Sequence, residues 1–262
     1  MSEHKFVVLA YKESEFLEDC IKSVLNQKYP SEVAIATTTP NKHIKDLAKK
    51  YKLQVFETKH TTIGGDFDFA ISCGGKTPLV TVAHQDDVYD SEYSARIVEA
   101  YKKAGRKAQI IFSDYYEIRN GKKVTTNTNL KIKRILLFPL RFRGLSGYKW
   151  AKRFVLKFGN AICCPAVTFN TGRIKLPVFE YDMTCDVDWH AWEVLSKKAG
   201  KFVFVNEKLM GHRIHEESET SNTINDDRRS AEDYEIYQRF WPKWLARKFT
   251  KAYKNSEKSN KV

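Results

Sequence analysis

In the stretch TVAHQDDVYD, residues 81–90, a short run of β-branched residues stops at two adjacent carboxylates, Asp86 and Asp87. A buried strand that ends on paired acids places them at the carboxyl edge of a sheet, where open α/β folds bind ligands. Carboxylates are hard oxygen ligands suited to Mg²⁺ or Mn²⁺, and such ions commonly neutralise a diphosphate. Asp is also a typical helix N-cap, and an amphipathic pattern follows from Ser91 to Lys103, so capping is the alternative role for this pair.

Strands and helices alternate on the N-terminal side of this stretch. An apolar strand from Phe6 to Ala10 precedes a helix whose apolar face recurs at Phe16, Leu17, Cys20, Ile21, Val24 and Leu25. The pattern then predicts a strand over 32–39, a helix around His43 to Tyr51, a strand over 53–58, a turn at Gly64 and Gly65, a helix over Asp66 to Ser72, and a strand from Leu79 to Ala83. Alternation at this spacing indicates βαβ units, and hence an α/β fold with a mostly parallel sheet flanked by helices.

The composition is typical of a soluble enzyme. With 262 residues, 42% of them hydrophobic, the chain can bury a full core and is expected to form one large domain, alone or with an appendage. No apolar run reaches the roughly 18–20 residues that cross a bilayer, and the first residues lack the apolar core of a signal peptide, so we expect a cytoplasmic protein. The five cysteines include no CxxC pair, which fits a reducing compartment and gives no zinc pattern.

Positive charge is concentrated in one interval. No acidic residue lies between Glu117 and Glu180, whereas this interval holds 14 Lys and Arg. Without these 14 residues the chain would carry 31 basic and 32 acidic residues, so the interval accounts for the whole net charge of +13. We therefore treat residues 118–179 as a distinct basic segment inserted in the domain.

Within this segment, LKIKRILLFPLRFRGLSGYKWAKRFVLKF (130–158) interleaves Lys and Arg with large apolar side chains. Such a pattern is what an interfacial helix on an anionic membrane needs, and it predicts a membrane-facing or acceptor-facing surface. A helical pair packed on the sheet with a solvated basic face is the alternative. A nucleic-acid surface fits less well, because the apolar residues are numerous and no nucleic-acid motif is present.

The C-terminal stretch WPKWLARKFTKAYKN (241–255) repeats this composition. It places Trp241, Trp244, Leu245, Phe249 and Tyr253 near one helical face with basic residues around them, which favours the membrane surface slightly over a plain amphipathic helix that closes the domain. We predict an amphipathic helical extension over 226–254 and a disordered tail over 255–262, since the tail has little to bury.

Five segments, in this order, resemble the inverting family 2 glycosyltransferases of the GT-A fold. They are VVLAYKESEFLEDCIKSVLNQKYP (7–30), IGGDFDFAIS (63–72), HQDDVY (84–89), DVDWHAWEVLSKKAG (186–200) and HRIHEESETS (212–221). The resemblance covers roughly residues 5–220 and implies a GT-A-like catalytic domain over 1–225. Two positions depart from the family pattern: ATTTPN (36–41) replaces the usual Asp-Asp-Gly-Ser turn, and His84 replaces the first Asp of the metal motif.

The resemblance also implies roles for individual residues. Asp188 would be the base that inversion requires, with Asp186 as the alternative, and Asp87 and His215 would hold Mn²⁺ or Mg²⁺. The nucleotide-sugar would be bound by Ala10, Tyr11, Glu13, Thr38, Thr39, Asp66, Asp86 and Arg213, with Asp86 at the ribose or the water shell of the metal.

The sequence thus predicts a metal-dependent inverting glycosyltransferase that uses a nucleotide-diphospho-sugar, with UDP as the expected nucleotide. The acceptor would be a glycan or a polyprenyl-linked glycan of a bacterial surface polysaccharide, and the enzyme would be peripheral on the inner face of the membrane. A nucleotidyltransferase would need a Gly-rich basic loop after the first strand, which LAYKESE (9–15) lacks. A non-catalytic protein that binds membrane or nucleic acid would leave HQDDVY and DVDW without a role.

Overall fold

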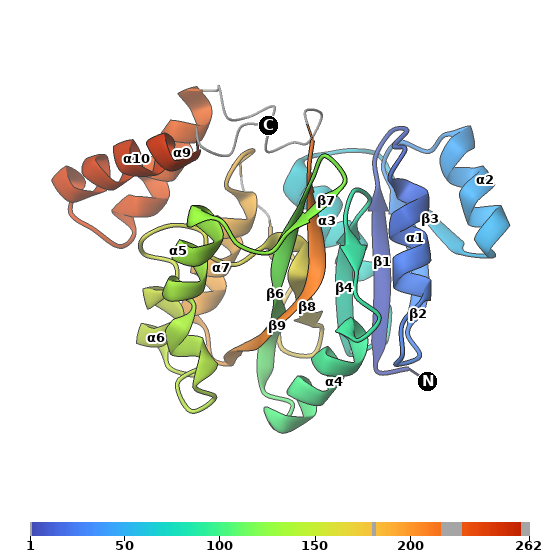
Figure 1. Ribbon diagram of the computed structural model, residues 1–262, viewed down its shortest axis with the longest axis horizontal. Coiled ribbons are helices and arrows are strands. Elements are labelled where there is room, and N and C mark those ends of the chain that lie inside the picture. The colour runs from blue at the N-terminus through green and yellow to red at the C-terminus, as the bar shows by residue number, and fades with distance from the viewer. Residues whose placement is uncertain (1, 180–181, 216–226, 258–262) are drawn as a thin grey trace.

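The computed structural model describes residues 2–179, 182–215 and 227–257, which form one sheet with helices on both faces (Figure 1). The strands are β1 (His4–Ala10), β2 (Glu32–Thr37), β3 (Gln54–Glu57), β4 (Leu79–His84), β5 (Val88–Tyr89), β6 (Ala108–Arg119), β7 (Lys122–Val124), β8 (Val167–Asn170) and β9 (Lys201–Ile214). The helices are α1 (Leu17–Leu25), α2 (Lys42–Tyr51), α3 (Ile63–Ser72), α4 (Tyr93–Lys103), α5 (Thr128–Leu136), α6 (Lys149–Phe154), α7 (Val187–Lys197), α9 (Asp227–Gln238) and α10 (Lys243–Glu257), with 3₁₀ turns η1 (Phe138–Arg141) and η2 (Cys164–Ala166). The predicted α/β class is confirmed.

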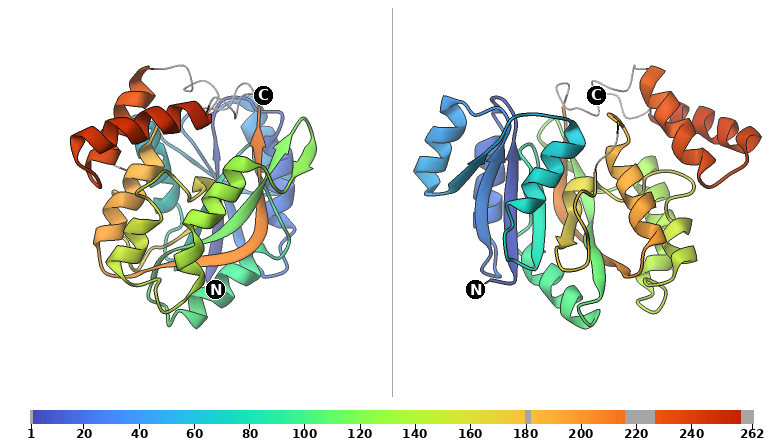
Figure 2. Two further views of the ribbon diagram at one scale, coloured as in Figure 1. Left: turned by 60° about the vertical axis from the view of Figure 1, so that its left-hand side comes forward. Right: turned by 180° about the vertical axis from the view of Figure 1, so that it is seen from behind.

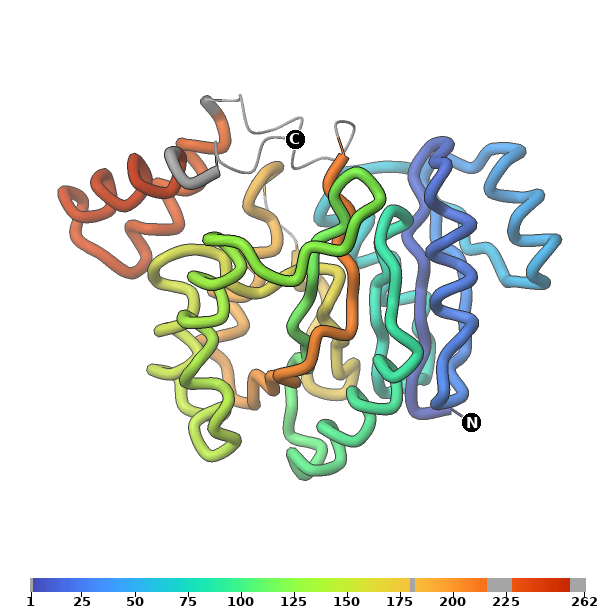
Figure 3. Tube along the Cα trace, in the orientation of Figure 1, coloured from blue at the N-terminus to red at the C-terminus, as the bar shows by residue number. Residues whose placement is uncertain are grey.

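The strand order β3-β2-β1-β4-β8-β6-β9-β5 fixes where a ligand can bind. The longer pairings are parallel: β1 with β2 and β4, β2 with β3, and β6 with β9. The short strands β5, β7 and β8 pair antiparallel. Because the order reverses between β1 and β4, their carboxyl ends leave a crevice at the switch point of the sheet. After α7 the chain returns through β9 (Figure 3), which ends at the same edge.

Alternate residues of the strands supply two cores, one on each face of the sheet. Phe6 and Val8 of β1 belong to the core under α1, α2 and α4, whereas Val7 belongs to the core under α3, α6 and α7. This follows from the period of two along a strand. The second core also holds Trp189 and Trp192 of α7, which are fully buried.

Helix α3 begins earlier than the sequence predicted. We expected a turn at Gly64 and Gly65, but both lie in the first turn of the helix, where the side chain of Thr62 accepts a hydrogen bond from the Gly65 N–H. A Cβ on Gly64 would stand 2.0 Å from the carbonyl oxygen of Phe179. The glycine is therefore needed for close approach of two backbones, which a local pattern does not reveal.

The basic segment is less exposed than its composition suggested. Lys152 is buried and donates to the carbonyls of Lys198 and Gly200 at 2.6 and 3.1 Å, and burial lowers its pKa to about 8. Arg134 pairs with Asp114 at 2.8 Å, and Arg153 pairs with Glu193 at 2.5 Å. Part of the charge thus serves the fold, as the alternative of a packed helical pair requires.

The C-terminal helices close the domain. Trp241 donates from Nε1 to the carbonyl of Lys157 at 2.7 Å, and Tyr253 contacts the ring of Trp189 at 5.5 Å between centroids. Among the aromatic residues predicted to face a membrane, Trp244 is the exposed one, with 62% of its surface accessible. The membrane interpretation of this stretch is therefore wrong for Trp241, Phe249 and Tyr253, which pack against the core. Phe249 and Tyr253 lie on the inner stripe of α10, and Trp241 lies just before this helix.

The predicted boundaries near the C-terminus agree in part. Helix α10 extends to Glu257, past the predicted start of a disordered tail at 255. Residues 258–262 and the boundary at 225 lie outside the described residues. In the described part of the chain, no helix has the length and apolarity to span a bilayer.

Candidate active site

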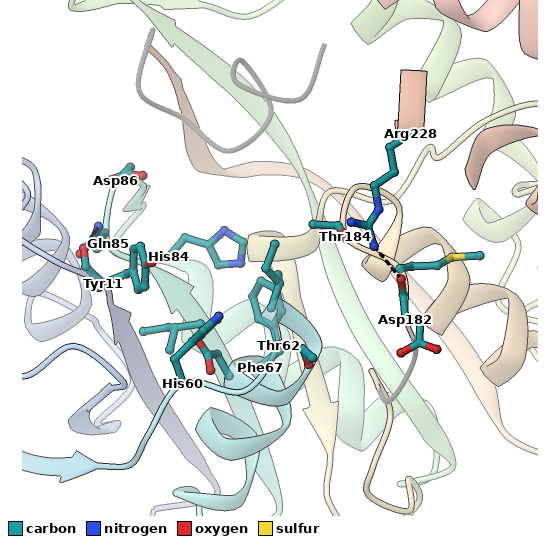
Figure 4. Close-up of a pocket in the computed structure, with 14 residues that line it drawn as sticks. Tyr11, His60, Thr62, Phe67, His84, Gln85, Asp86, Asp182, Thr184 and Arg228 are labelled. Atoms are coloured by element: carbon teal, nitrogen blue, oxygen red, sulfur yellow. Dashed lines mark hydrogen bonds and ion pairs between the residues drawn. The ribbon is translucent and has the colours of Figure 1, made fainter. Parts of the chain in front are cut away.

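A cavity of about 650 Å³ lies at the carboxyl ends of β1 and β4. Tyr11, His84 and Asp86 line it from the sheet, and Thr184 and Arg228 line it from the opposite side (Figure 4). A second cavity, of about 290 Å³, shares His84 and Asp86 with the first and extends to Asp188. The two cavities therefore adjoin, with shared residues on the wall between them.

The ends of β1 and β4 are held together by a side chain that the sequence analysis did not single out. Gln85 accepts from the N–H of Tyr11 at 3.0 Å and donates to the carbonyl of Tyr11 at 2.9 Å. Lys12, the residue after Tyr11, has a positive φ of 55° and donates from its N–H to the hydroxyl of Thr39 at 2.5 Å. These contacts fix the floor of the crevice and bring Tyr11 and Thr39 close to the turn after β4.

Asp66 gathers two further groups at the wall of the larger cavity. Its Oδ2 accepts from the hydroxyl of Thr38 at 2.9 Å and from Nδ1 of His60 at 2.7 Å. Asp66 and His60 line the cavity, and Thr38 lies directly behind Asp66. The predicted residues Thr38 and Asp66 are thus brought together, and His60, which lies in the loop after β3, joins them.

Two other residues predicted to bind the nucleotide contribute differently. Ala10 is fully buried at the end of β1, so its side chain belongs to the core, and only its backbone approaches the crevice. Glu13 is exposed and is not among the described residues that line either cavity. The structure therefore does not bring the Glu13 side chain into this site.

Asp86 presents its carboxylate to both cavities. Its Oδ1 accepts from the hydroxyl of Ser14 at 3.0 Å, and its Oδ2 lies 3.4 Å from Nε2 of His215. The side chains of Asp86 and His215 keep 27% and 20% of their surface accessible. An accessible carboxylate oxygen next to an imidazole nitrogen is a pair that can share one divalent ion.

Asp87 is buried and lines the smaller cavity. Its Oδ1 accepts from Nδ1 of His212 at 3.1 Å and from the N–H of Arg213 at 2.9 Å. Burial opposes the charge of this carboxyl, but the contacts with His212 and Arg213 hold its pKa below the usual value. The carboxylate predicted to bind the metal directly is therefore engaged by the end of β9.

Arg213 also contacts the turn between β4 and β5. Its Nε donates to the carbonyl of Asp86 at 2.9 Å, and its guanidinium lies 4.3 Å from the centre of the Phe16 ring. Since Arg213 also lines the smaller cavity, its remaining N–H groups can reach an anion bound there.

Asp188 faces the smaller cavity from the first turn of α7. Its Oδ2 accepts from the side-chain amide of Asn160 at 2.7 Å, and its Oδ1 accepts from the N–H of Trp189 at 2.7 Å. Burial raises the pKa of this carboxyl, which increases its proton affinity as a general base requires. Lys133 lines the same cavity and donates to the hydroxyl of Tyr115 at 3.1 Å.

Asp186, the alternative base, has a different environment. It is buried, and both burial and the neighbouring Asp233 raise its pKa well above the usual value. It occupies the N-cap position of α7 without a capping hydrogen bond from its side chain. Asp188 is thus the more accessible of the two carboxylates.

The loop before α7 is anchored by a residue of the C-terminal helices. Glu232 of α9 accepts from the N–H groups of Thr184 at 3.0 Å, Cys185 at 2.8 Å and Asp186 at 3.0 Å. Arg228, one turn earlier in α9, donates to the carbonyl of Asp182 at 3.3 Å, as Figure 4 shows. No sequence pattern indicated this anchor, because its two halves lie 46 residues apart.

His84 stands where the two cavities meet, next to the ring of Phe67 at 5.1 Å between centroids. Burial lowers its pKa, so the imidazole is neutral near pH 7. Its Nε2 is buried and has no hydrogen-bond partner among the described residues. An orphaned polar atom at this position is available to a bound ligand.

Two side chains of the site, Asp86 and His215, could act as ligands of a divalent ion. Asp86 supplies an accessible carboxylate oxygen, the buried Nε2 of His215 lies 3.4 Å from it, and a nucleotide diphosphate would supply further oxygens. Among the described residues, no group of three or more His, Cys, Asp or Glu is arranged to hold an ion. The side chains alone therefore form an incomplete site, which suits an ion that binds together with its nucleotide.

Comparisons with known proteins agree with this geometry. A family model described as Glycosyl transferase family 2 matches residues 6–163. The structure of TarS 1-349 from S. aureus is similar, with a TM-score of 0.61 and 11% identity over 95% of this chain and 69% of that chain. The complex of TarS 1-349 with UDP-GlcNAc has a TM-score of 0.57 and 13% identity over 92% and 71% of the two chains.

A third similar structure is the mannosyltransferase PcManGT from Pyrobaculum calidifontis in complex with GDP-Man and Mn²⁺. It has a TM-score of 0.59 and 11% identity over 98% of this chain and 72% of that chain. At these identities the likeness is one of fold, and it confirms the predicted GT-A-like architecture. No curated protein matches the chain.

Proposed function

Because the chain belongs to glycosyl transferase family 2 and is a glycosyltransferase, we propose that its donor is a nucleotide-diphospho-sugar and that the nucleotide is UDP. The observation that carries this proposal is the position of Asp86 and Asp188 on the walls of two adjoining cavities. The complexes of similar structures with UDP-GlcNAc and with GDP-Man support a nucleotide-sugar as donor.

The larger cavity would hold the nucleoside. Tyr11 and Asp66 line this cavity and offer an aromatic ring and a carboxylate. The hydroxyls of Thr38 and Thr39 lie next to them, through contacts with Asp66 and with the N–H of Lys12. Asp86 would meet the ribose or the diphosphate, and its position at the border of both cavities supports this role. The neutral imidazole of His84 and the guanidinium of Arg213 would donate to phosphate oxygens.

We assign the divalent ion, Mn²⁺ or Mg²⁺, to Asp86 and His215. When bound, the ion would neutralise the charge that develops on the leaving diphosphate. Asp87, the direct ligand expected from the sequence, would instead hold the ends of β4 and β9 in register through His212 and the N–H of Arg213.

Transfer would proceed with inversion. The acceptor hydroxyl would attack the anomeric carbon from the side opposite the diphosphate, while Asp188 takes the hydroxyl proton. Its raised pKa gives it the required proton affinity, and the amide of Asn160 fixes the orientation of its carboxylate.

The acceptor would be a glycan, free or linked to a polyprenyl carrier, in the assembly of a bacterial surface polysaccharide. Because such carriers lie in the membrane, we place the enzyme at the cytoplasmic face of the cell membrane as a peripheral protein. Nucleic acid is not expected as a partner.

A donor screen tests the reaction class. UDP-sugars and GDP-sugars are incubated with the enzyme and Mn²⁺, with EDTA as the control, and release of the nucleoside diphosphate is measured. Metal-dependent release of UDP is the expected result. Formation of a nucleotide-sugar from UTP and a sugar phosphate, with release of pyrophosphate, would instead identify a nucleotidyltransferase and contradict the proposal.

A further inference from the structure

An exposed apolar surface lies on the basic segment. Of the nine large hydrophobic side chains that are most exposed in the described part of the chain, six lie between residues 132 and 150. They are Ile132 (47% exposed), Ile135 (70%), Phe138 (53%), Phe142 (52%), Tyr148 (57%) and Trp150 (57%). We call these six residues, together with Lys131, Arg141, Arg143 and Lys149, the α5–α6 surface.

Each element of this segment is divided into an inner and an outer side. In α5, Leu130 is buried and Lys133 and Arg134 contact Tyr115 and Asp114, whereas Ile132 and Ile135 point away from the core. The outer residues therefore contribute nothing to the core. Their exposure leaves apolar area in water that the fold itself does not require.

The exposed rings form pairs on this outer side. The centroids of Phe138 and Phe142 lie 5.3 Å apart, and those of Tyr148 and Trp150 lie 6.5 Å apart. The guanidinium of Arg141 lies 5.9 Å from the centre of the Phe138 ring. Helices α5 and α6 lie on the flank of the sheet opposite α1 and α2 in every view (Figures 1 and 2), so this flank is available to a large partner.

The charges on this surface have one sign. Lys131, Arg141, Arg143 and Lys149 are exposed, and none of them forms an ion pair with a described residue. No acidic residue occurs in the surrounding sequence from 118 to 179. Lys152 and Arg153 serve the fold and face inward. Arg141 lies over the Phe138 ring, and Lys131, Arg143 and Lys149 are sequence neighbours of Ile132, Phe142 and Trp150, so the exposed cations of the α5–α6 surface are interleaved with its apolar side chains.

From this arrangement we propose that the α5–α6 surface docks on an anionic lipid bilayer. Aromatic and aliphatic side chains can enter the boundary between head groups and acyl chains while adjacent Lys and Arg contact lipid phosphates. A nucleic acid would leave Ile132 and Ile135 without a role, and an apolar protein interface would leave the four cations without counter-charges.

Docking would also bring a lipid-linked acceptor close to Asp188, an inference that rests on the proposed function. The inner side of the same segment supplies Lys133, Asn160 and residues 162–164 to the smaller cavity. The basic segment would therefore contact the membrane with its outer side and line the cavity of Asp188 with its inner side. A glycan whose carrier lipid remains in the bilayer could then reach the base without leaving the membrane.

Vesicle sedimentation with the full chain tests the docking. The parent protein is mixed with phosphatidylglycerol–phosphatidylcholine vesicles or with pure phosphatidylcholine vesicles at low and high salt. We expect binding to the anionic vesicles that weakens as salt rises. Ile135→Ser with Trp150→Ser tests the apolar part, and Lys131→Glu with Lys149→Glu tests the charge. Each pair should lower the partition coefficient by at least about tenfold.

The controls use exposed residues on the other side of the molecule. Leu25→Ser and Lys49→Glu should leave vesicle binding unchanged, and all variants should keep the parental melting temperature because the changed residues are exposed. Release of UDP from a soluble donor should also persist, which separates failure of docking from failure of the proposed function. Equal binding to neutral and anionic vesicles, an equal loss in the controls, or self-association of the parent through this surface would overturn the proposal.

Discussion

The carboxylate of Asp87 lies 3.1 Å from Nδ1 of His212, so the turn after β4 is tied to the last residues of β9. This contact decides which of the two adjacent acids can meet a ligand. Asp87 is 1% exposed and lines the smaller cavity, where His212 and Arg213 already engage its carboxylate, whereas Asp86 lines both cavities. Asp86 is therefore the more accessible of the two acids, and Asp87 is the one held by the end of β9.

Substitution of each acid by Asn should separate these two roles. Asp86→Asn should weaken Mn²⁺-dependent binding of UDP by at least about tenfold, measured by calorimetry, with little change in melting temperature. Asp87→Asn should instead lower the free energy of unfolding by about 3 kcal/mol, because it removes one partner of a buried charge pair. If Asp87→Asn abolishes metal-dependent binding while the protein stays as stable as the parent, Asp87 is the ligand.

Asp188→Asn should lower turnover by about 10²–10⁴ and leave the binding of UDP and Mn²⁺ almost unchanged, since a general base acts on the acceptor and not on the donor. Asp186→Asn is the matched control in the same loop. It should cost far less activity, because the raised pKa of Asp186 makes a neutral amide a good replacement. Near-parental turnover in Asp188→Asn would show that Asp188 is not the base.

Glu232→Gln should lower kcat by about tenfold or more, because an amide accepts less strongly than a carboxylate from the three N–H groups that anchor the loop before α7. The affinity for UDP should change less. The control is Glu235→Gln in the same helix, whose side chain is 58% exposed. An equal effect of the two substitutions on kcat would show that Glu232 does not position the loop.

The burial of His4 predicts that the free energy of unfolding depends on pH. It is fully buried, with Nδ1 2.8 Å from the hydroxyl of Ser31 and Nε2 2.8 Å from that of Thr81, and burial lowers its pKa to about 3. Between about pH 6.5 and pH 3 the unfolded chain binds a proton here that the folded protein does not. This residue's contribution to the free energy of unfolding therefore falls as the pH falls through that window.

Urea unfolding at about pH 7 and about pH 5 checks this expectation. The loss of stability between the two values should be smaller in His4→Gln than in the parent by about 2 kcal/mol. His43→Gln on α2, whose ring is only partly buried, serves as the control and should retain the parental difference. The same loss in His4→Gln as in the parent would show that His4 does not carry the effect.

The parts of the structure that depend on local pattern were predictable. Periodicity reveals the strand before Asp86 and the helix after Ala10, and the meeting of β1 and β4 at one edge follows from parallel pairing. Tyr11 and Asp86 could thus be expected at one edge of the sheet, whereas the place of Asp188 in the same site was implied by the family resemblance. Glu13 was assigned to the nucleotide together with Ala10 and Tyr11, but its side chain is exposed.

Contacts between distant segments were not predictable in this way. Lys152 counts as a surface cation in the sequence, but its partners are carbonyls 46 and 48 residues away. The choice between Asp86 and Asp87 depends on a turn of three residues and on where β9 ends, and neither leaves a pattern. Gln85, Asn160 and Glu232 are single polar residues without a sequence pattern. Each is important because the fold brings it to a partner far along the chain: Tyr11, Asp188 and the loop before α7, respectively.

The anchoring of the loop before α7 by Glu232 has a consequence for synthesis. The ribosome adds Glu232 46 residues after Asp186, which at usual rates of translation takes about 2–9 s. Through that interval the nascent chain already has β1 and β4, whose ends form the crevice, but the loop that leads into α7 is without the carboxylate that orders its backbone. The crevice can therefore form before the proposed base Asp188 is positioned, and we expect sugar transfer only after α9 has been made and docked.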